Sequence, residues 1–186
     1  MLLDQCMPNY HFSEIHETSI SASAERVFGV LREVTLDELP LFRVLVTLRA
    51  LPARLAGRSR LVLNRGETLV SWAQRSGFEL LGEVPNEELL FVTVGQFWRV
   101  LGSRSSRVVN AGQFPSFLPR SYVKVATNFR LSKISLGSTR IMTETRVYPV
   151  DSNALRKFSR YWRIIQPGSA LIRREWLRAI KRRAER

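Results

Sequence analysis

Few residues of this sequence have the type and spacing that metal binding or catalysis requires. The two histidines, His11 and His16, have an odd spacing that would place them on opposite faces of a strand, where they cannot bind the same metal ion. The single cysteine, Cys6, is expected to lie in a flexible terminus and has no recognisable base beside it, so we do not expect it to act as a nucleophile. The sequence has no HExxH, GxSxG, phosphate-loop or dinucleotide-binding motif. It therefore predicts neither a metal site nor a cofactor.

The positive charge of the chain gathers at its C-terminal end. The formal net charge is +13, and the segment from Asp151 to Arg186 holds eleven Lys or Arg against three Asp or Glu. Such a surface favours acidic partners. Because no DNA- or RNA-recognition motif is readable, nucleic acid is not expected, and an anionic membrane surface is the candidate partner. The alternative is a solvated face without a partner. The basic residues in question are Arg156, Lys157, Arg160, Arg163, Arg173, Arg174, Arg178, Lys181, Arg182 and Arg183.

The length and composition indicate one globular domain. A chain of 186 residues with 45% hydrophobic residues can form a single core, so residues 1–186 are predicted to be one domain. One cysteine permits no internal disulfide, which fits a cytoplasmic location. Met1–Phe12 lacks the pattern of a secretory signal. Three arginines interrupt Leu39–Leu55, the longest apolar-leaning stretch, so it does not have the character of a membrane span.

The segment from Asp151 to Arg186 is predicted to be one long helix with an apolar face. Its apolar and small residues recur at steps of three and four, which is the repeat of one side of a helix. They are Leu155, Phe158, Trp162, Ile165, Ser169, Ile172, Trp176 and Ala179. Asp151 offers an N-cap, and Pro167-Gly168 predicts a kink.

The residues before this helix are predicted to form a strand, two helices and a run of antiparallel strands. The expected strands are Tyr10–Ile20, Gly77–Val84, Glu88–Phe97, Val108–Phe114, Tyr122–Ser132 and Ser138–Val150, with hairpins around 85–87 and 135–137. The expected helices start at Ser21 or Ser23 and at Thr35 or Asp37, the second ending near Pro52 or Gly57, with a short one at Glu67–Arg75. The expected loops are Arg58–Arg65, Gly102–Ser106 and Pro115–Pro119. A long amphipathic helix after a sheet is expected to pack across a concave face and to leave a cavity there.

Two regions of the sequence, Ser21–Phe28 and Thr143–Arg173, resemble the SRPBCC or START-like superfamily, which includes polyketide cyclases and lipid-transfer domains. Ser21-Ala22-Ser23-Ala24-Glu25-Arg26-Val27-Phe28 resembles its first strand-to-helix segment, with Ser23 where Pro is common. The end of the chain resembles an uncharacterised bacterial branch, through Thr143-Glu144-Thr145-Arg146-Val147, Phe158-Ser159-Arg160-Tyr161-Trp162 and Gln166-Pro167-Gly168-Ser169 with Leu171-Ile172-Arg173. The resemblance implies an α+β helix-grip fold, in which a curved antiparallel sheet wraps around a long C-terminal helix and two shorter helices follow the first strand. It also implies a ligand cavity, and no particular reaction.

The same resemblance implies that the first and last strands are antiparallel neighbours. The last strand then has two sets of side chains, one containing Glu144 and Arg146 and the other containing Ile141, Thr143, Thr145 and Val147. If the first set faces the cavity, Glu144 and Arg146 form one polar cluster with Glu14, His16 and Asn128, and Arg146→Ala weakens ligand binding more than it lowers the melting temperature. If the second set faces the core, the polar set is the solvated face of the sheet.

The expected function is binding or carriage of a lipid-like or aromatic molecule without catalysis. The predicted ligand-binding residues are Phe12, Glu14, His16, Asn128, Glu144, Arg146, Phe158, Trp162 and Ile165. One alternative is a cyclase- or hydratase-like enzyme that uses His16 with Glu14 or Glu144 for proton transfer. Another is a protein that docks on anionic membrane or nucleic acid through its basic helix.

Overall fold

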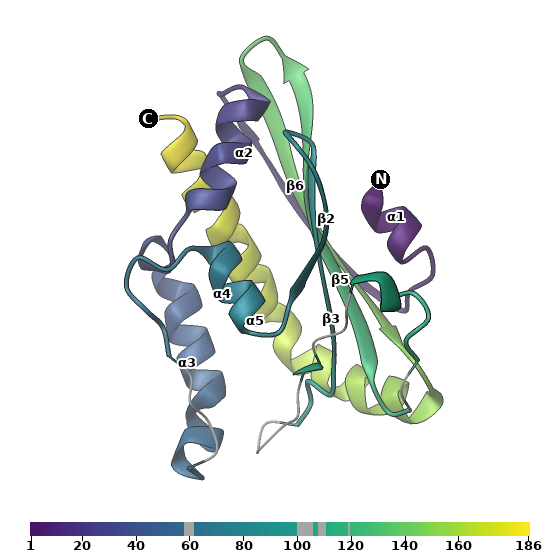
Figure 1. Cartoon of the computed structure of the whole chain (residues 1–186). Helices are drawn as coiled ribbons and strands as arrows, with labels where there is room; N and C mark the ends of the chain where they lie inside the picture. The colour runs from purple at the N-terminus through teal and green to yellow at the C-terminus, as the bar shows by residue number, and fades with distance from the viewer. Residues whose placement is uncertain (58–61, 100–105, 108–110, 119) are drawn as a thin grey trace.

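The computed structural model describes residues 1–57, 62–99, 106–107, 111–118 and 120–186. These residues form an α+β structure in which a long C-terminal helix lies along an antiparallel sheet (Figure 1). The helices are α1 (Leu2–Cys6), α2 (Ala24–Glu33), α3 (Pro40–Leu55), α4 (Leu69–Arg75) and α5 (Ser152–Ala184), with short 3-10 helices η1 (Leu36–Glu38) and η2 (Ala111–Gln113). The strands are β1 (Phe12–Ile20), β2 (Glu79–Val84), β3 (Glu88–Gly95), β4 (Ser106–Arg107), β5 (Val123–Ser135) and β6 (Ser138–Pro149).

The strands lie in the order β1-β6-β5-β3-β2, with every pairing antiparallel and β4 paired to β3 off this path. The first and last strands are neighbours, from Phe12 opposite Val147 to Ile20 opposite Thr139, as the resemblance implies. Both expected hairpins are present. Asn86 and Gly137 lie in their turns with φ of 63° and 76°, a left-handed conformation that Asn tolerates and Gly adopts without strain.

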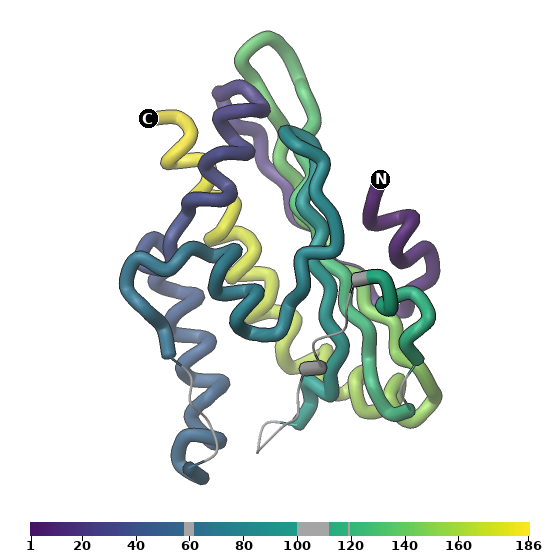
Figure 2. Tube along the Cα trace, viewed as in Figure 1, coloured from purple at the N-terminus to yellow at the C-terminus, as the bar shows by residue number. Residues whose placement is uncertain are grey.

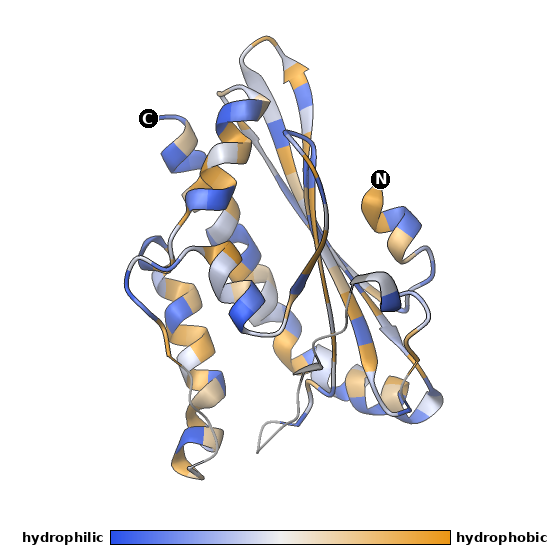
Figure 3. Ribbon diagram, viewed as in Figure 1, coloured by the Kyte–Doolittle hydropathy of each residue, from blue (hydrophilic) through white to orange (hydrophobic). Residues whose placement is uncertain are grey.

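Helix α5 covers one face of the sheet. It begins where the sequence predicts, because the Asp151 carboxylate accepts a hydrogen bond from the Ala154 N–H at 2.8 Å. The helix continues through Pro167 and changes direction along its length (Figure 2). Apolar and hydrophilic segments alternate along it, as its amphipathic pattern requires (Figure 3).

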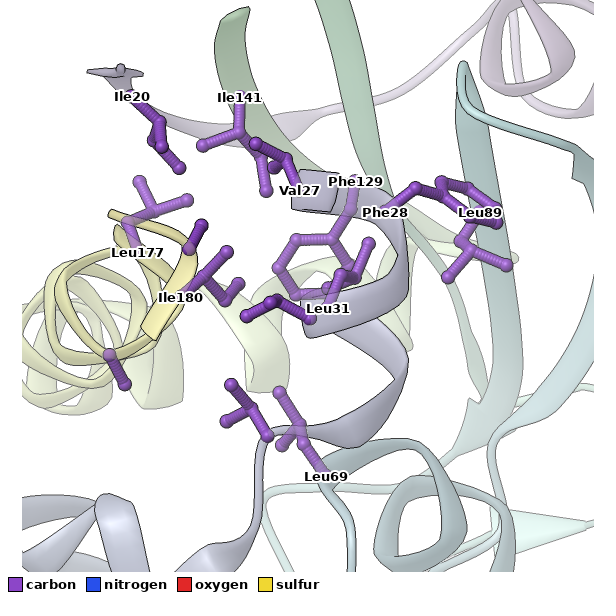
Figure 4. Close-up of a cluster of buried hydrophobic side chains, with 14 of the residues drawn as sticks. Ile20, Val27, Phe28, Leu31, Leu69, Leu89, Phe129, Ile141, Leu177 and Ile180 are labelled. Atoms are coloured by element: carbon purple, nitrogen blue, oxygen red, sulfur yellow. The ribbon is translucent and has the colours of Figure 1, made fainter. Parts of the chain in front are cut away.

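Two clusters of buried side chains hold α5 against the sheet. Near its C-terminal end, Leu177 and Ile180 pack with α2 residues Val27 and Leu31, and all four are at most 3% exposed. Figure 4 shows these side chains beside Phe129 and Ile141 of the sheet. At the other end of the helix, Ala154 and Phe158 pack on residues of β5 and β6. The middle of α5 thus spans the sheet between two packed regions.

The N-terminal segment differs from the expectation that Cys6 lies in a flexible terminus. Residues Leu2–Cys6 form α1, and Leu3 and Met7 are 0% and 4% exposed. They pack with Leu90, Val92 and other residues on the sheet face that α5 does not cover. Burial raises the pKa of the Cys6 thiol to about 11, against the opposing charge of Lys124, so it is protonated at neutral pH.

The predicted strand Val108–Phe114 is wrong where the structure describes it, because Ala111–Gln113 is a 3-10 helix. Residues 108–110 of that strand lie outside the described residues, as do residues 58–61, 102–105 and 119 of the three expected loops. The expected Gly102–Ser106 loop is wrong at its end, because Ser106 belongs to β4. The other predicted strands and helices are present with shifted ends. The architecture is that of the α+β helix-grip fold, so the expected fold class is confirmed. In the described part of the chain, no helix is long and apolar enough to span a membrane.

Candidate ligand-binding site

A cavity of about 430 Å³ lies between the sheet and the middle of α5. The sheet contributes its face toward α5, and α2, α3 and α4 close the sides. Ten of the lining side chains are aromatic: Phe42, Trp72, Phe78, Phe91, Phe97, Phe129, Phe158, Tyr161, Trp162 and Trp176. The remaining lining residues are mostly aliphatic, so the cavity favours an apolar ligand.

Three of the predicted ligand-binding residues line this cavity: Phe158, Trp162 and Ile165. They come from the apolar face of α5 that the sequence pattern defines. Phe12 of β1 is not among the lining residues but packs behind two of them, with ring centroids 5.2 Å from Phe158 and 5.8 Å from Trp162. This aromatic group forms the end of the cavity near the start of α5.

A row of polar side chains crosses the middle of the sheet on the face toward α5. Glu14 of β1 pairs with Thr145 of β6, which pairs with Thr127 of β5. The Thr127 and Thr145 hydroxyl oxygens are 2.9 Å apart and hydrogen-bonded. Ser169 and Arg173, one turn apart on α5, lie over this row. The cavity therefore has a polar side within otherwise apolar walls.

Arg173 is the buried charge of this polar side. It lines the cavity, is 9% exposed, and donates a hydrogen bond from Nη1 to the Thr127 hydroxyl at 3.1 Å. Its guanidinium carbon lies 4.7 Å from the centre of the Trp176 ring. Burial lowers the pKa of Arg173 to about 10, opposed by the negative charge of Glu14, so the guanidinium is protonated at neutral pH.

The expectation that Arg173 belongs to the basic face of the helix is wrong, because its side chain is buried and lines the cavity. Arg173 follows Ser169 by four residues and precedes Trp176 by three, so its position in the repeat is on the apolar side. This spacing was the signal for an inward side chain. The high positive charge of the segment from Asp151 to Arg186 favoured the interpretation that Arg173 is one of its exposed basic residues.

Glu14 and His16 lie on the α5 side of the sheet, next to the cavity but not in its lining. One Glu14 oxygen lies 2.8 Å from His16 Nε2, and the other accepts a hydrogen bond from the Ser169 hydroxyl at 2.8 Å. The carboxylate is thus in the middle of the group. A serine that a histidine activates needs the imidazole in the middle, so this order does not make Ser169 a nucleophile.

The expected single cluster with Glu144, Arg146 and Asn128 does not form, because these residues lie on the opposite face of the sheet. His16 pairs with Thr143, and Ile15 pairs with Glu144, so the side chain of Glu144 points away from that of His16. A pairing of His16 with Glu144 for proton transfer is therefore excluded by the register.

The residues of β6 that line the cavity are Thr145 and Val147, which belong to the other set of side chains on this strand.

The opposite face is not solvated either, because α1 covers it. Glu144 and Arg146 are 4% and 7% exposed, and they form an ion pair of 2.6 Å. Arg146 also donates to Asp4 at 2.7 Å and to the Met7 carbonyl at 3.1 Å. Asn128 donates to Glu88, which accepts hydrogen bonds from the first N–H groups of α1. These polar residues therefore anchor the N-terminal segment.

Arg49 lies at the edge of the cavity and connects three parts of the chain. It projects from α3, donates to the Tyr161 hydroxyl of α5, and donates to the Phe97 carbonyl after β3 at 3.1 Å. Arg49 and Ile164 are exposed residues of the lining, and Ile164 is 79% exposed. The opening of the cavity to solvent is therefore on this side.

No protein-family model matches the chain, and the search of curated proteins found no match. Solved structures similar to it include a protein of Chromobacterium violaceum, which is 14% identical with a TM-score of 0.41 over 94% of this chain and 98% of that one. The di-domain ARO/CYC protein BexL of the BE-7585A biosynthetic pathway is 13% identical with a TM-score of 0.42 over 94% of this chain and 47% of that one. The Zhui aromatase/cyclase of Streptomyces sp. R1128 is 11% identical with a TM-score of 0.37 over 94% of each chain. At such identities and TM-scores the similarities do not indicate what the cavity binds.

Proposed function

We propose that this protein binds or carries a hydrophobic small molecule, lipid-like or aromatic, in the cavity under α5. The observation that carries the proposal is a volume of about 430 Å³ lined by ten aromatic side chains. Ligand pockets are typically about 300–1,000 Å³. A ligand that fills this space removes apolar surface from water and gains close contacts with the aromatic walls, and both effects favour binding.

The proposal is tested with N-phenyl-1-naphthylamine, a neutral apolar dye whose fluorescence rises in apolar surroundings. We expect saturable binding to the parent protein. Ile165→Trp is expected to weaken it several-fold, because the larger ring occupies space that Ile165 borders. Leu171→Trp is the matched control, because it places the same ring on the same helix at a side chain that is 45% exposed and outside the lining. Absence of saturable binding to the parent, or equal losses in the two variants, would contradict the proposal.

A second candidate function, docking on an anionic membrane, is favoured by an exposed apolar stripe on α3. The stripe consists of Val44, Leu48, Leu51 and Leu55, which are 54%, 53%, 40% and 86% exposed. Their steps of four, three and four place them on one side of the helix. The other side of α3 lines the cavity with Phe42, Leu45 and Val46. The exposed Arg54 and the exposed basic residues of α5 add attraction to anionic head groups, about 1 kcal/mol per residue near the surface.

Membrane docking is tested by sedimentation with vesicles of phosphatidylcholine alone or with phosphatidylserine. We expect binding to the anionic vesicles that decreases as salt rises. Leu48→Asp with Leu51→Asp should abolish it, because a charged stripe cannot enter the acyl region. Leu136→Asp is the control, since Leu136 is 94% exposed in the β5–β6 turn. No binding by the parent protein, or an equal loss from the control, would rule out the stripe as the docking surface.

A further inference from the structure

Arg173 carries a positive charge in the cavity and has no carboxylate in direct contact with its guanidinium. No Asp or Glu of the described ranges forms an ion pair with it. Its contacts are one hydroxyl oxygen, on Thr127, and the face of the Trp176 ring. A guanidinium has five N–H donors in a planar fork. Most of those of Arg173 have no hydrogen-bond acceptor among the described residues. A buried charge of this kind is costly unless an anion pairs with it.

The carboxylate whose negative charge acts on Arg173 is Glu14, which forms no ion pair with the guanidinium. Glu14 lies on the same side of the sheet, but one carboxylate oxygen binds His16 and the other accepts the Ser169 hydrogen bond. The Thr127 oxygen that Arg173 contacts is itself bonded to Thr145. The polar row thus holds Arg173 in place and offers its guanidinium no directly paired carboxylate.

Other donors in residues around the cavity also lack acceptors. The indole N–H groups of Trp72 and Trp176 are buried without a hydrogen-bond partner in the described structure, and both residues line the cavity. A buried indole N–H ordinarily has a partner. These two N–H groups are enclosed by protein, so Arg173 is the lining residue whose charge favours a ligand with a negatively charged acceptor.

We infer that the ligand is an amphipathic monocarboxylate, whose apolar body fills the cavity and whose carboxylate pairs with the Arg173 guanidinium. This inference rests on the proposed function. A carboxylate matches the fork of N–H groups in two parallel hydrogen bonds. A neutral apolar molecule would leave the guanidinium unpaired, and a doubly charged phosphate would bring one more negative charge than Arg173 balances.

The test compares decanoate with decanol, which share an apolar chain and differ in charge, by direct calorimetric titration. The parent protein is expected to bind decanoate about tenfold or more tightly than decanol, the usual advantage of a hydrogen-bonded charge pair. Arg173→Met should remove this preference by weakening decanoate binding while leaving decanol and the neutral dye bound. Because the pair is buried, the preference should persist when salt is raised.

The matched control is Arg174→Met, which removes the same charge from the neighbouring exposed position. It should keep the preference for decanoate. If the parent binds both ligands equally, or if Arg174→Met loses the preference as Arg173→Met does, the inference is wrong while the proposed apolar binding stands. If the dye, decanol and decanoate all fail to bind, the proposed function and the inference both fail.

Thermal unfolding without ligand separates recognition from a structural role. Arg173→Met keeps a flexible apolar stem in place of the arginine methylenes and removes a buried charge that has no ion pair, so its melting temperature should equal or exceed that of the parent. Decanoate should raise the melting temperature of the parent and not that of the variant. A variant that melts well below the parent would instead show that Arg173 serves the packing of α5.

Discussion

At the scale of one residue, the role of Arg146 depends on which face of the sheet its side chain lies on. Its ion pairs with Glu144 and Asp4 and its bond to the Met7 carbonyl hold the N-terminal segment against the sheet. Arg146→Ala leaves Glu144 buried without a counter-ion, so we expect the free energy of unfolding to fall by about 3 kcal/mol. Dye binding should be unchanged, because the cavity lies on the other face of the sheet. Urea unfolding and a dye titration on one preparation measure both.

This outcome is the reverse of the sequence-based hypothesis for Arg146. Arg140→Ala, on the same strand at an exposed position, is the control and should change stability by less than about 0.5 kcal/mol. A stable Arg146→Ala protein with weakened dye binding would restore the hypothesis.

Gly168 is a second position where a single substitution has a definite expectation. It lies inside α5, and a Cβ added there would meet no atom within 4 Å. Ala restricts the unfolded chain and favours helix, so Gly168→Ala should raise the free energy of unfolding by about 0.5–1 kcal/mol. Chemical unfolding measures it. A loss of stability would mean that the helix needs the freedom of glycine beside Pro167.

At the scale of elements, α5 caps α3. Leu39 at the N-cap of α3 provides no side-chain acceptor. The Glu175 carboxylate accepts hydrogen bonds from the N–H groups of Leu41 at 2.8 Å and Phe42 at 2.7 Å instead. Its negative charge also complements the positive end of the helix dipole.

Glu175→Ala should therefore lower the free energy of unfolding by about 1–2 kcal/mol and speed hydrogen exchange in the first turn of α3. Glu175→Gln retains one acceptor oxygen and should lose less. Equal exchange rates in all three proteins would show that α3 is held by its apolar contacts alone.

The spacing of apolar residues in the sequence was sufficient to predict most helices and strands, but it was not sufficient to predict which residues line the cavity. Steps of three and four located the face of α5 that carries Phe158, Trp162 and Ile165. Alternation on β6 separates its side chains into two sets but does not say which set faces α5. Both sets are largely buried, since α1 covers one of them, and five residues are too few for α1 to show a helical period. The spacing from Ser169 and Trp176 indicates that Arg173 lies on the apolar side of α5, but its hydrogen bond to Thr127 depends on how the helix lies over the sheet, which only the three-dimensional structure provides.

At the scale of the whole molecule, carboxylates that join separate segments should make the free energy of unfolding fall at acid pH. The hydrogen bonds from the backbone N–H groups of Ala154 and Ser121 lower the pKa of the Asp151 carboxyl, which ties the start of α5 to the segment before β5. The hydrogen bonds from Arg75 lower the pKa of the Glu67 carboxyl, which ties α4 to the segment before it.

Because both carboxyls have a lower pKa when folded, the unfolded chain takes up protons first as the pH falls. Their contribution is complete above about pH 5 and is lost on acidification through the unfolded values, about 3.9 for Asp and 4.3 for Glu, and onward to the folded ones. Urea unfolding at several pH values between 7 and 3 should show this decline. Asp151→Asn keeps an N-cap acceptor but cannot titrate, so its free energy of unfolding should fall less steeply with acid than that of the parent. Parallel curves for the two proteins would mean that the Asp151 charge does not link α5 to Ser121, and that the neutral cap alone holds the start of the helix over the sheet.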